Sequence, residues 1–169
     1  MDARPRIFAL SFAGGGCGRP GLASPGMEIS FIAGFGPITR DDGAREFWGG
    51  MLGLPLAEIA PGYWGADEDR LPGAKAFALW PLAHAAQAVF GADGWPADLA
   101  EPQAWVELDV ASREAVADAV SELAARGQRV LSAAHDEPWG QTTARLLSPE
   151  GLLVGVTYTP WMRASAPTA

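Results

Sequence analysis

The sequence has few basic residues, a single cysteine and no long hydrophobic run. Lysine and arginine total 12 against 20 aspartate and glutamate residues, a formal net charge of −8, and no extended basic cluster occurs. Nucleic acid and anionic membranes are therefore excluded as expected partners. Cys17, being alone, forms neither an internal disulfide nor a thiolate zinc site. Since the apolar runs are much shorter than the roughly 20 residues of a membrane span, we expect a soluble, cytoplasmic protein.

The first 26 residues differ in composition from the rest of the chain. They are rich in Gly, Pro, Ser and Arg, with one apolar stretch, Ile7–Ala13. Arg4 and Arg6 before that stretch allow an export signal as an alternative, but the apolar core is short for one. We predict a disordered extension at 1–26, with Met27 as a natural start, followed by a single domain at 27–162 and a flexible tail at 163–169.

Apolar and helical patterns in the first half of the domain predict a strand, a helix and two further strands. The helix is expected to begin at a Thr39 cap, to run from Asp41 to Leu52 and to bury one stripe of side chains. That stripe consists of Ala44, Phe47, Trp48 and Met51. The strands are Glu28–Ile38, whose Gly34 and Gly36 indicate close backbone approach, Leu54–Ile59 and Ala74–Leu82, with Pro61–Gly73 as a polar loop and Ala83–Phe90 as a brief helix.

After a linker at 91–102 the same order of elements begins again. Ala104–Val110 reads as a strand, Ser112 as the cap of a helix that ends at Gly127, and Arg129–Ser132 as a strand. Two apolar strands then form a closing hairpin, Thr142–Leu147 and Leu152–Tyr158, joined by the turn Ser148-Pro-Glu-Gly151. This recurrence predicts an α+β fold built from two βαβββ modules, at about 28–95 and 103–161.

Two segments resemble the vicinal oxygen chelate superfamily, which includes glyoxalase I, bleomycin-resistance proteins and extradiol dioxygenases. Arg45-Glu-Phe-Trp-Gly-Gly-Met-Leu-Gly-Leu-Pro-Leu56 resembles its helix-to-strand segment FY-x-x-x-LGLPL. Glu137-Pro-Trp-Gly-Gln141 and Leu147-Ser-Pro-Glu-Gly-Leu-Leu-Val154 resemble its close, E-P-W-G…DP(D/E)G-N-L-I-E. The resemblance covers about 28–161. It implies a cup formed by the paired modules around a ligand, and a homodimer.

The metal enzymes of that superfamily carry a His or carboxylate on each of four cup-facing strands, and the resemblance places these positions on other residue types here. They fall on Ala33 or Phe35, on Leu79 or Trp80, on Trp105 and on Gly155. None of these is a metal ligand. The resemblance therefore implies a cup without a cofactor and without a divalent metal.

Alternation along Ala104–Val110 places Trp105, Glu107 and Asp109 on one face of the strand. That face is either solvent-exposed or directed into the cup, where a tryptophan beside a carboxylate could stack on and orient a ligand. Arg145 on the closing hairpin is a candidate partner of Glu107, and such a pair is more often structural than catalytic. His135 with Glu137 is a candidate acid–base pair, although exposed histidines are the commoner case.

These patterns predict a protein that binds a small planar or aromatic molecule without a catalytic metal. Tryptophans at loop or cup-facing positions would form the walls, since aromatic side chains with few polar groups line small-molecule pockets. The candidate ligand-binding residues are Trp80, Trp105, Glu107, His135, Trp139, Gln141 and Arg145. The alternative is a lyase, isomerase or dioxygenase of the same fold with an unrecognised metal site or an acid–base pair. The sequence does not decide whether the protein is an enzyme.

Overall fold

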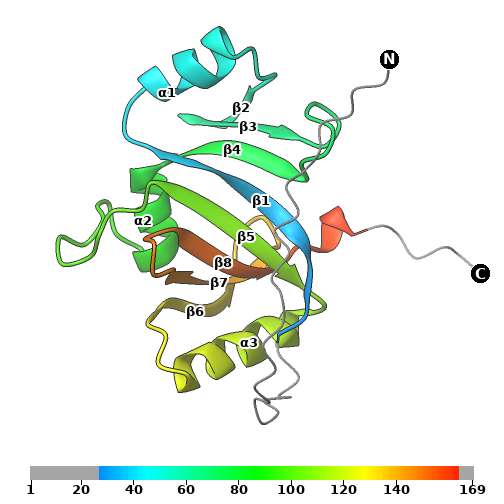
Figure 1. Ribbon diagram of the computed structural model, residues 1–169, viewed down its shortest axis with the longest axis vertical. Coiled ribbons are helices and arrows are strands. Elements are labelled where there is room, and N and C mark those ends of the chain that lie inside the picture. The colour runs from blue at the N-terminus through cyan, green and yellow to red at the C-terminus, as the bar shows by residue number, and fades with distance from the viewer. Residues whose placement is uncertain (1–26, 164–169) are drawn as a thin grey trace, which may run out of the picture.

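A computed structural model describes residues 27–163, and the predictions for residues 1–26 and for 164–169 lie outside it. Its strands form one eight-stranded sheet in the order β2-β3-β4-β1-β5-β8-β7-β6. Figure 1 shows β1 and β5 side by side in the middle of the sheet, with α1 and α3 at its opposite ends. No helix in residues 27–163 is long and apolar enough to cross a membrane.

The elements repeat in two βαβββ modules, as the sequence predicts. The first contains β1 Ile29–Thr39, α1 Gly43–Arg45 continued by the π-helical η1 Glu46–Met51, β2 Ala57–Ala60, β3 Tyr63–Asp67 and β4 Ala76–Pro81. The second contains β5 Ala104–Val110, α3 Arg113–Ala125, β6 Val130–Asp136, β7 Thr142–Leu147 and β8 Leu153–Tyr158. Helix α2, Leu82–Phe90, connects them, and the short 3₁₀ helix η2, Pro160–Met162, follows β8.

Pairing within the sheet repeats as well. In each module the first strand pairs in parallel with the last, β1 with β4 and β5 with β8, whereas β1 and β5 join the modules in an antiparallel pair. Gly36 allows the close approach of β1 to β4, because a Cβ on it would lie 2.0 Å from the Ala78 carbonyl oxygen. The predicted close backbone approach in this strand is confirmed.

Helices α3 and α2 cover opposite faces of the sheet and bury separate cores. Helix α3 buries Val116, Ala119 and Val120 against alternate residues of β5, β7 and β8, among them Val110 and Val156. Ser112 caps it through a hydrogen bond from the Ala115 amide to the serine Oγ at 3.2 Å, as predicted. Helix α2 packs on the other face, where Ala85 and Val89 meet Trp105, Leu153 and Ala78. The α2 face is the inner face of the cup, and the α3 face is its outer face.

Three predictions for the first module are wrong. Thr39 caps no helix, because it is the last residue of β1 and Asp42 precedes α1 without a side-chain cap. The segment 61–73 is not entirely loop, since Tyr63–Asp67 forms β3 and pairs with β4. The stripe of Ala44, Phe47, Trp48 and Met51 is not buried.

A π-helical turn explains the exposed stripe. The Leu52 amide donates to the Phe47 carbonyl five residues earlier, at 3.0 Å, so the residues after Phe47 are rotated away from ordinary helical spacing. Trp48 packs against Phe77 of β4 at 5.3 Å between ring centroids, and Phe35 of β1 meets the same ring at 5.5 Å. Met51, expected on the buried stripe, is instead 71% exposed.

Candidate functional site

The inner face of the second module holds a buried ionic cluster centred on Arg145 of β7. The side chain of Arg145 is 1% exposed, and its Nη1 lies 2.6 Å from Glu137 Oε1. Glu137 Oε1 has no hydrogen-bond partner within residues 27–163, so the contact is an ion pair, and Nη1 donates to the Ala88 carbonyl oxygen of α2 at 3.4 Å. Glu107 of β5 lies on the other side, with Oε1 3.8 Å from Nη2. One guanidinium therefore stands between two carboxylates, the arrangement that makes removal of the shared partner costly.

Polar side chains extend the cluster toward the protein surface. Gln141 donates from Nε2 to Glu107 Oε2 at 2.8 Å and lies 3.2 Å from Thr159 Oγ1. The indole N–H of Trp139 donates to Gln141 Oε1 at 2.9 Å, and Trp139 is 54% exposed. His135 Nε2 lies 3.5 Å from Glu137 Oε1, which brings the predicted acid–base pair together. The cluster thus runs from a buried arginine to an exposed indole.

Two tryptophans, one from each module, adjoin the cluster. Trp80 of β4 and Trp105 of β5 meet edge to face at 5.6 Å between centroids, and Arg145 Cζ lies 5.4 Å from the Trp80 ring centre. The Trp105 indole N–H donates to the Ala78 carbonyl at 3.3 Å, and Trp105 is buried. Trp105 is therefore a core side chain, whereas Trp80 is half-buried. All seven predicted binding residues lie in this one cluster, and their role in binding stays a prediction.

Other predicted positions lie elsewhere. Phe35 of β1 is on the outer face, where its ring meets Phe77, and Trp64 of β3 lies beneath Arg45 of α1 at 4.3 Å. Asp109 is buried at one end of β5, where it accepts from the Thr159 amide at 2.7 Å and pairs with Arg163, the first residue of the predicted tail.

Tyr63, Thr143 and Thr159 belong to the same region, although the sequence analysis did not select them. Burial raises the pKa of the Tyr63 phenol, and the nearby Glu107 carboxylate acts in the same direction. The sequence predicts a polar loop at 61–73, and this hides the position of Tyr63 in strand β3. Thr143 was recognisable, because it alternates with Arg145 on one face of β7.

The positions that the resemblance assigns to metal ligands hold no side chain that ligates a metal. Ala33 lies at an irregularity of β1, and its neighbour Gly34 pairs with Glu107. A Cβ on Gly34 would lie 2.8 Å from the Trp105 ring, and one on Gly155 of β8 would lie 2.8 Å from Glu107 Cγ. Trp105 and Glu107 thus fill the space above these two glycines. These residues do not fit the divalent metal of the superfamily's enzymes. In residues 27–163, no group of three or more His, Cys, Asp and Glu side chains is placed to hold a metal ion.

Burial raises the pKa of the Glu107 carboxyl, with Glu137 and Asp109 adding to the effect, while Arg145 and the Gln141 hydrogen bond act against it. The folded protein therefore binds the Glu107 proton more tightly than the unfolded chain does. The stability that this proton supplies is present below the ordinary pKa of glutamate, about 4.3, and is lost as the pH rises through the higher folded value.

Replacing Glu107 by glutamine is expected to raise the free energy of unfolding at neutral pH and to leave it nearly unchanged near pH 4. The amide resembles the protonated carboxyl and keeps an oxygen for Gln141. Urea unfolding at both pH values measures the difference. Glu101→Gln is the matched control, because Glu101 pairs with Arg40 on the surface. A variant that is less stable than the wild type at neutral pH would contradict the argument.

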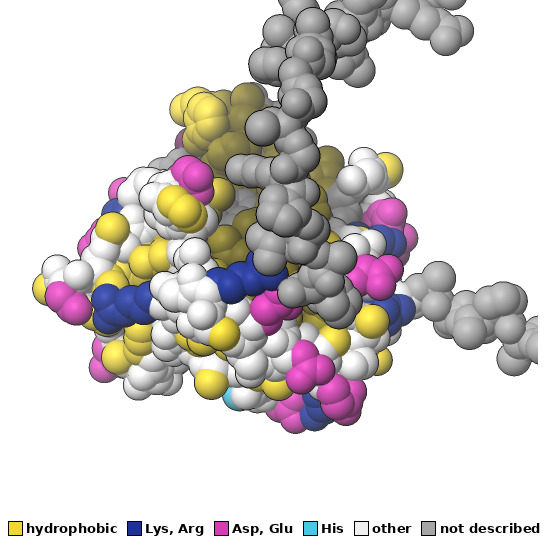
Figure 2. Space-filling view, turned by 60° about the horizontal axis from the view of Figure 1, so that its bottom comes forward, with side chains coloured by type: hydrophobic (Ala, Val, Ile, Leu, Met, Phe, Trp, Pro, Cys, Tyr) yellow, Lys and Arg dark blue, Asp and Glu magenta, His cyan; other side chains and the backbone are white. Residues whose placement is uncertain are grey.

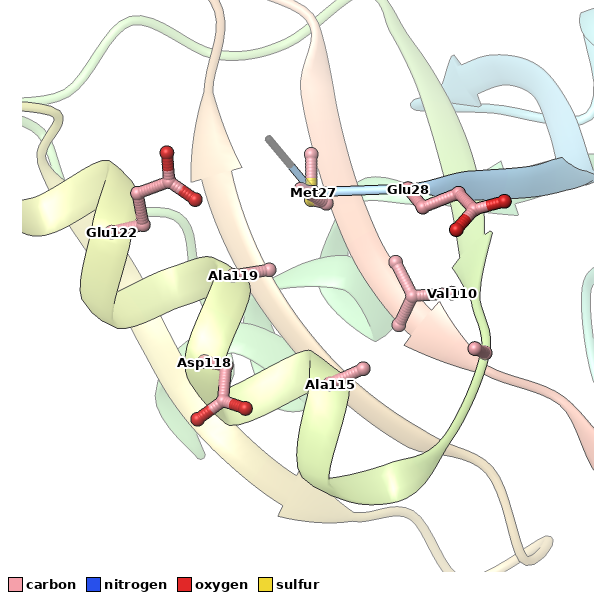
Figure 3. A pocket seen from close by; sticks show the side chains of 8 residues that line it. Met27, Glu28, Val110, Ala115, Asp118, Ala119 and Glu122 are labelled. Atoms are coloured by element: carbon pink, nitrogen blue, oxygen red, sulfur yellow. The ribbon is translucent and has the colours of Figure 1, made fainter. Parts of the chain in front are cut away.

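Two surface hollows lie away from this cluster. One of about 160 Å³ lies between α3 and the start of β1, with Ala115, Ala119, Val110 and Met27 around it and Glu28, Asp118 and Glu122 at its rim (Figure 3). Another, of about 260 Å³, lies between η1 and β3 and includes Trp64. On the part of the surface visible in Figure 2 outside the grey atoms, basic side chains are interspersed with acidic and apolar ones. Neither hollow contains a predicted binding residue.

No family model and no curated protein sequence matches the chain. Solved structures do. One described as an NAD-dependent benzaldehyde dehydrogenase from Legionella pneumophila is 11% identical, with a TM-score of 0.51 over 74% of this chain and 96% of that one.

Two further structures are described as glyoxalase/bleomycin resistance protein/dioxygenase proteins. The one from Vibrio splendidus is 16% identical over 74% of this chain and 96% of its own, with a TM-score of 0.49. The one from Nocardioides is 24% identical over 84% and 90%, with a TM-score of 0.34. At these identities the likeness concerns the fold, and the predicted α+β fold of two βαβββ modules is confirmed.

Proposed function

We propose that the protein binds a small planar or aromatic molecule in the cup between its two modules, without a catalytic metal. The observation that carries this proposal is that two of the positions expected to hold metal ligands are Trp105 and Gly155, and that Glu107 fills the space above Gly155. The polar groups that remain, Gln141 and Arg145, suit the orientation of an organic ligand more than the coordination of an ion.

Tryptophans supply the expected contact surface for such a ligand. Trp139 is largely exposed and is fixed by its hydrogen bond to Gln141, and a Cβ on the adjacent Gly140 would lie 3.9 Å from the exposed Trp161 ring. Rigid indoles of this kind provide a large apolar area at a low cost in conformational entropy. Half-buried Trp80 adds an aromatic face beside Arg145, 5.4 Å from the guanidinium carbon to the ring centre.

Tryptophan fluorescence tests the proposal directly. Titration with planar aromatic compounds should give saturable quenching, whereas cyclohexanol, which is not planar, should give none. Trp139→Phe should weaken the quenching without changing the fold. Silence across the aromatic panel with an intact fold would overturn the proposal, and so would a tightly bound stoichiometric divalent metal in the purified protein.

An acid–base enzyme is the second candidate, as a lyase or isomerase that moves a proton. It is favoured by the His135–Glu137 contact and by the raised pKa of the Glu107 carboxyl, because groups with perturbed pKa values cluster at catalytic sites. A dioxygenase would require a metal. Exchange of solvent deuterium into a bound carbonyl compound, abolished by Glu107→Gln, would favour the enzyme over the binding protein.

We further propose that the protein acts as a homodimer in the cytoplasm. Apolar side chains remain exposed on the outer face of the first module, namely Ile32, Phe35, Phe47, Met51 and Leu52. Ring contacts through Trp48 and Phe77 connect two members of this set, Phe47 and Phe35. Large continuous apolar patches favour association, and the single cysteine of the chain makes no internal disulfide that an oxidising compartment would be needed to form.

Met51→Glu is expected to shift the protein from dimer to monomer, because a carboxylate would be buried in the contact. Sedimentation equilibrium measures the mass. Glu58→Gln is the control, since it alters an exposed residue of β2 that is not part of the apolar set. A wild-type protein that is monomeric at high concentration would contradict the dimer.

A further inference from the structure

Within residues 27–163, three buried groups on the inner face of β7 lack a hydrogen-bond partner. They are Nε and Nη2 of Arg145 and the hydroxyl of Thr143. Both residues are almost fully buried, and they alternate on the strand so that their side chains share the inner face. Buried polar groups without partners are uncommon in folded proteins, and each one calls for an explanation, such as a water, an ion or another bound group that it would contact.

The unpartnered groups lie around Gly155. Arg145 is opposite Gly155 in the β7–β8 pairing. The place that a Cβ on Gly155 would take is 3.5 Å from Thr143 Oγ1 and 3.5 Å from Glu107 Oε1. Nε–H and Nη2–H form one edge of the guanidinium, the edge that presents two parallel donors to one planar acceptor.

The charges of the cluster favour an uncharged acceptor. Arg145 is already paired with Glu137 at 2.6 Å, and the nearer Glu107 oxygen stays 3.8 Å from Nη2 without a hydrogen bond. Two carboxylates thus share one guanidinium, and burial raises the pKa of the Glu107 carboxyl. A ligand with a carboxylate would bring a third negative charge to a site in which the second, that of Glu107, is already unfavourable.

A ligand at the unpartnered edge of Arg145 would lie beside Glu107. The side chain of Glu107 retains 14% exposure, whereas the side chain of Arg145 retains 1%. Its carboxylate stands beside the free guanidinium edge, and Trp80 lies against the same guanidinium. A flat molecule on Trp80 would present its carbonyl oxygen to the unpartnered donors beside the Glu107 carboxylate, which Gln141 holds in place.

We infer that the ligand of the cup is an uncharged planar molecule with a carbonyl group, whose oxygen accepts hydrogen bonds from the Nε–Nη2 edge of Arg145 beside the Thr143 hydroxyl. The inference rests on the proposed binding function and specifies its ligand class. The carbonyl group distinguishes this class from aromatic hydrocarbons, and the absence of charge distinguishes it from aromatic acids.

Three naphthalene derivatives of similar shape test the ligand class by isothermal titration of the full chain at neutral pH. Naphthamide carries a neutral carbonyl, naphthoate carries a carboxylate, and methylnaphthalene carries no acceptor. We expect naphthamide to bind at least about tenfold more tightly than either of the others, the discrimination that a hydrogen-bonding site typically achieves. Naphthoate should gain affinity as the pH is lowered and Glu107 becomes protonated.

Thr143→Val removes one donor while nearly preserving volume, and it should fold because the hydroxyl has no partner to lose. We expect a several-fold loss of naphthamide affinity and no change for methylnaphthalene. Equal binding of all three probes would overturn the inference but leave the binding function standing. Buried water, and not the ligand, would then satisfy the donors of Arg145 and Thr143. Tighter binding of naphthoate at neutral pH would also overturn it. Absence of binding by every probe would overturn both proposals.

Discussion

Replacing Arg145 by methionine is expected to lower the free energy of unfolding by about 3–5 kcal/mol at neutral pH, because one buried cation balances two carboxylates. The side chain of Glu137 is 6% exposed and that of Glu107 is 14% exposed, so neither gains much solvation when the guanidinium is removed. Methionine replaces the volume of the stem, so the loss reports on charge more than on packing.

The dependence on pH distinguishes this cause from a packing defect. Protonation of the Glu107 carboxyl, whose pKa is raised by burial, removes part of the uncompensated charge, so the loss in the methionine variant should shrink as the pH falls. Urea unfolding at neutral and at acidic pH gives the measurement. Arg40→Met is the control, because Arg40 and Glu101 form a surface pair, and exposed pairs contribute about 0–1 kcal/mol. A loss for Arg145→Met that is the same at both pH values would contradict the electrostatic explanation.

Substitution of Gly155 by alanine is expected to cost about 1–3 kcal/mol, the range for overpacking a close-packed interior. The new Cβ would lie 2.8 Å from Glu107 Cγ, closer than such carbons approach in folded proteins. Glutamate at this position, which is the residue that the superfamily resemblance leads one to expect, should cost more, since it would add a third carboxylate to the cluster.

A double-mutant cycle shows whether Glu107 is the residue that occupies this space. In the Glu107→Ala background the alanine at position 155 should cost less than about 1 kcal/mol, because the obstructing Cγ is gone. Gly94→Ala serves as the control, since a Cβ on Gly94 meets nothing within 4 Å. An equal cost of Gly155→Ala in both backgrounds would show that some other contact excludes the side chain.

Most of the second module was well predicted from the sequence because its local signals agree with its tertiary structure, but β6 extends to Asp136, beyond the predicted end at Ser132. Ser112 caps α3, the predicted bounds of β5 and β7 are those observed, and the Gly151 amide donates to the Ser148 carbonyl at 2.9 Å in the predicted turn. Alternation along β5 directed Glu107 inward, and the pairing of β7 with β8 brought Arg145 to it.

The first module was less predictable because local composition and tertiary pairing disagree there. Gly62 and the acidic residues after Ala66 indicate a loop, yet Tyr63–Asp67 is held as a strand by its pairing with β4. The Gly49–Gly50 pair weakens the helix, and the π-helical turn that includes it changes which side chains face the sheet. The unpartnered donors of Arg145 depend on distances between strands, which no local pattern encodes.

The proposed function requires that the cup bind a planar molecule through its own side chains rather than through a metal. The most direct measurement is the affinity for naphthamide before and after exhaustive dialysis against EDTA, followed by addition of Zn²⁺, Ni²⁺ or Mn²⁺. The dissociation constant should be the same in every sample, because Trp80, Trp139, Thr143 and Arg145 are unchanged by the treatment. Binding that is lost on chelation and restored by one of the divalent ions would contradict the claim.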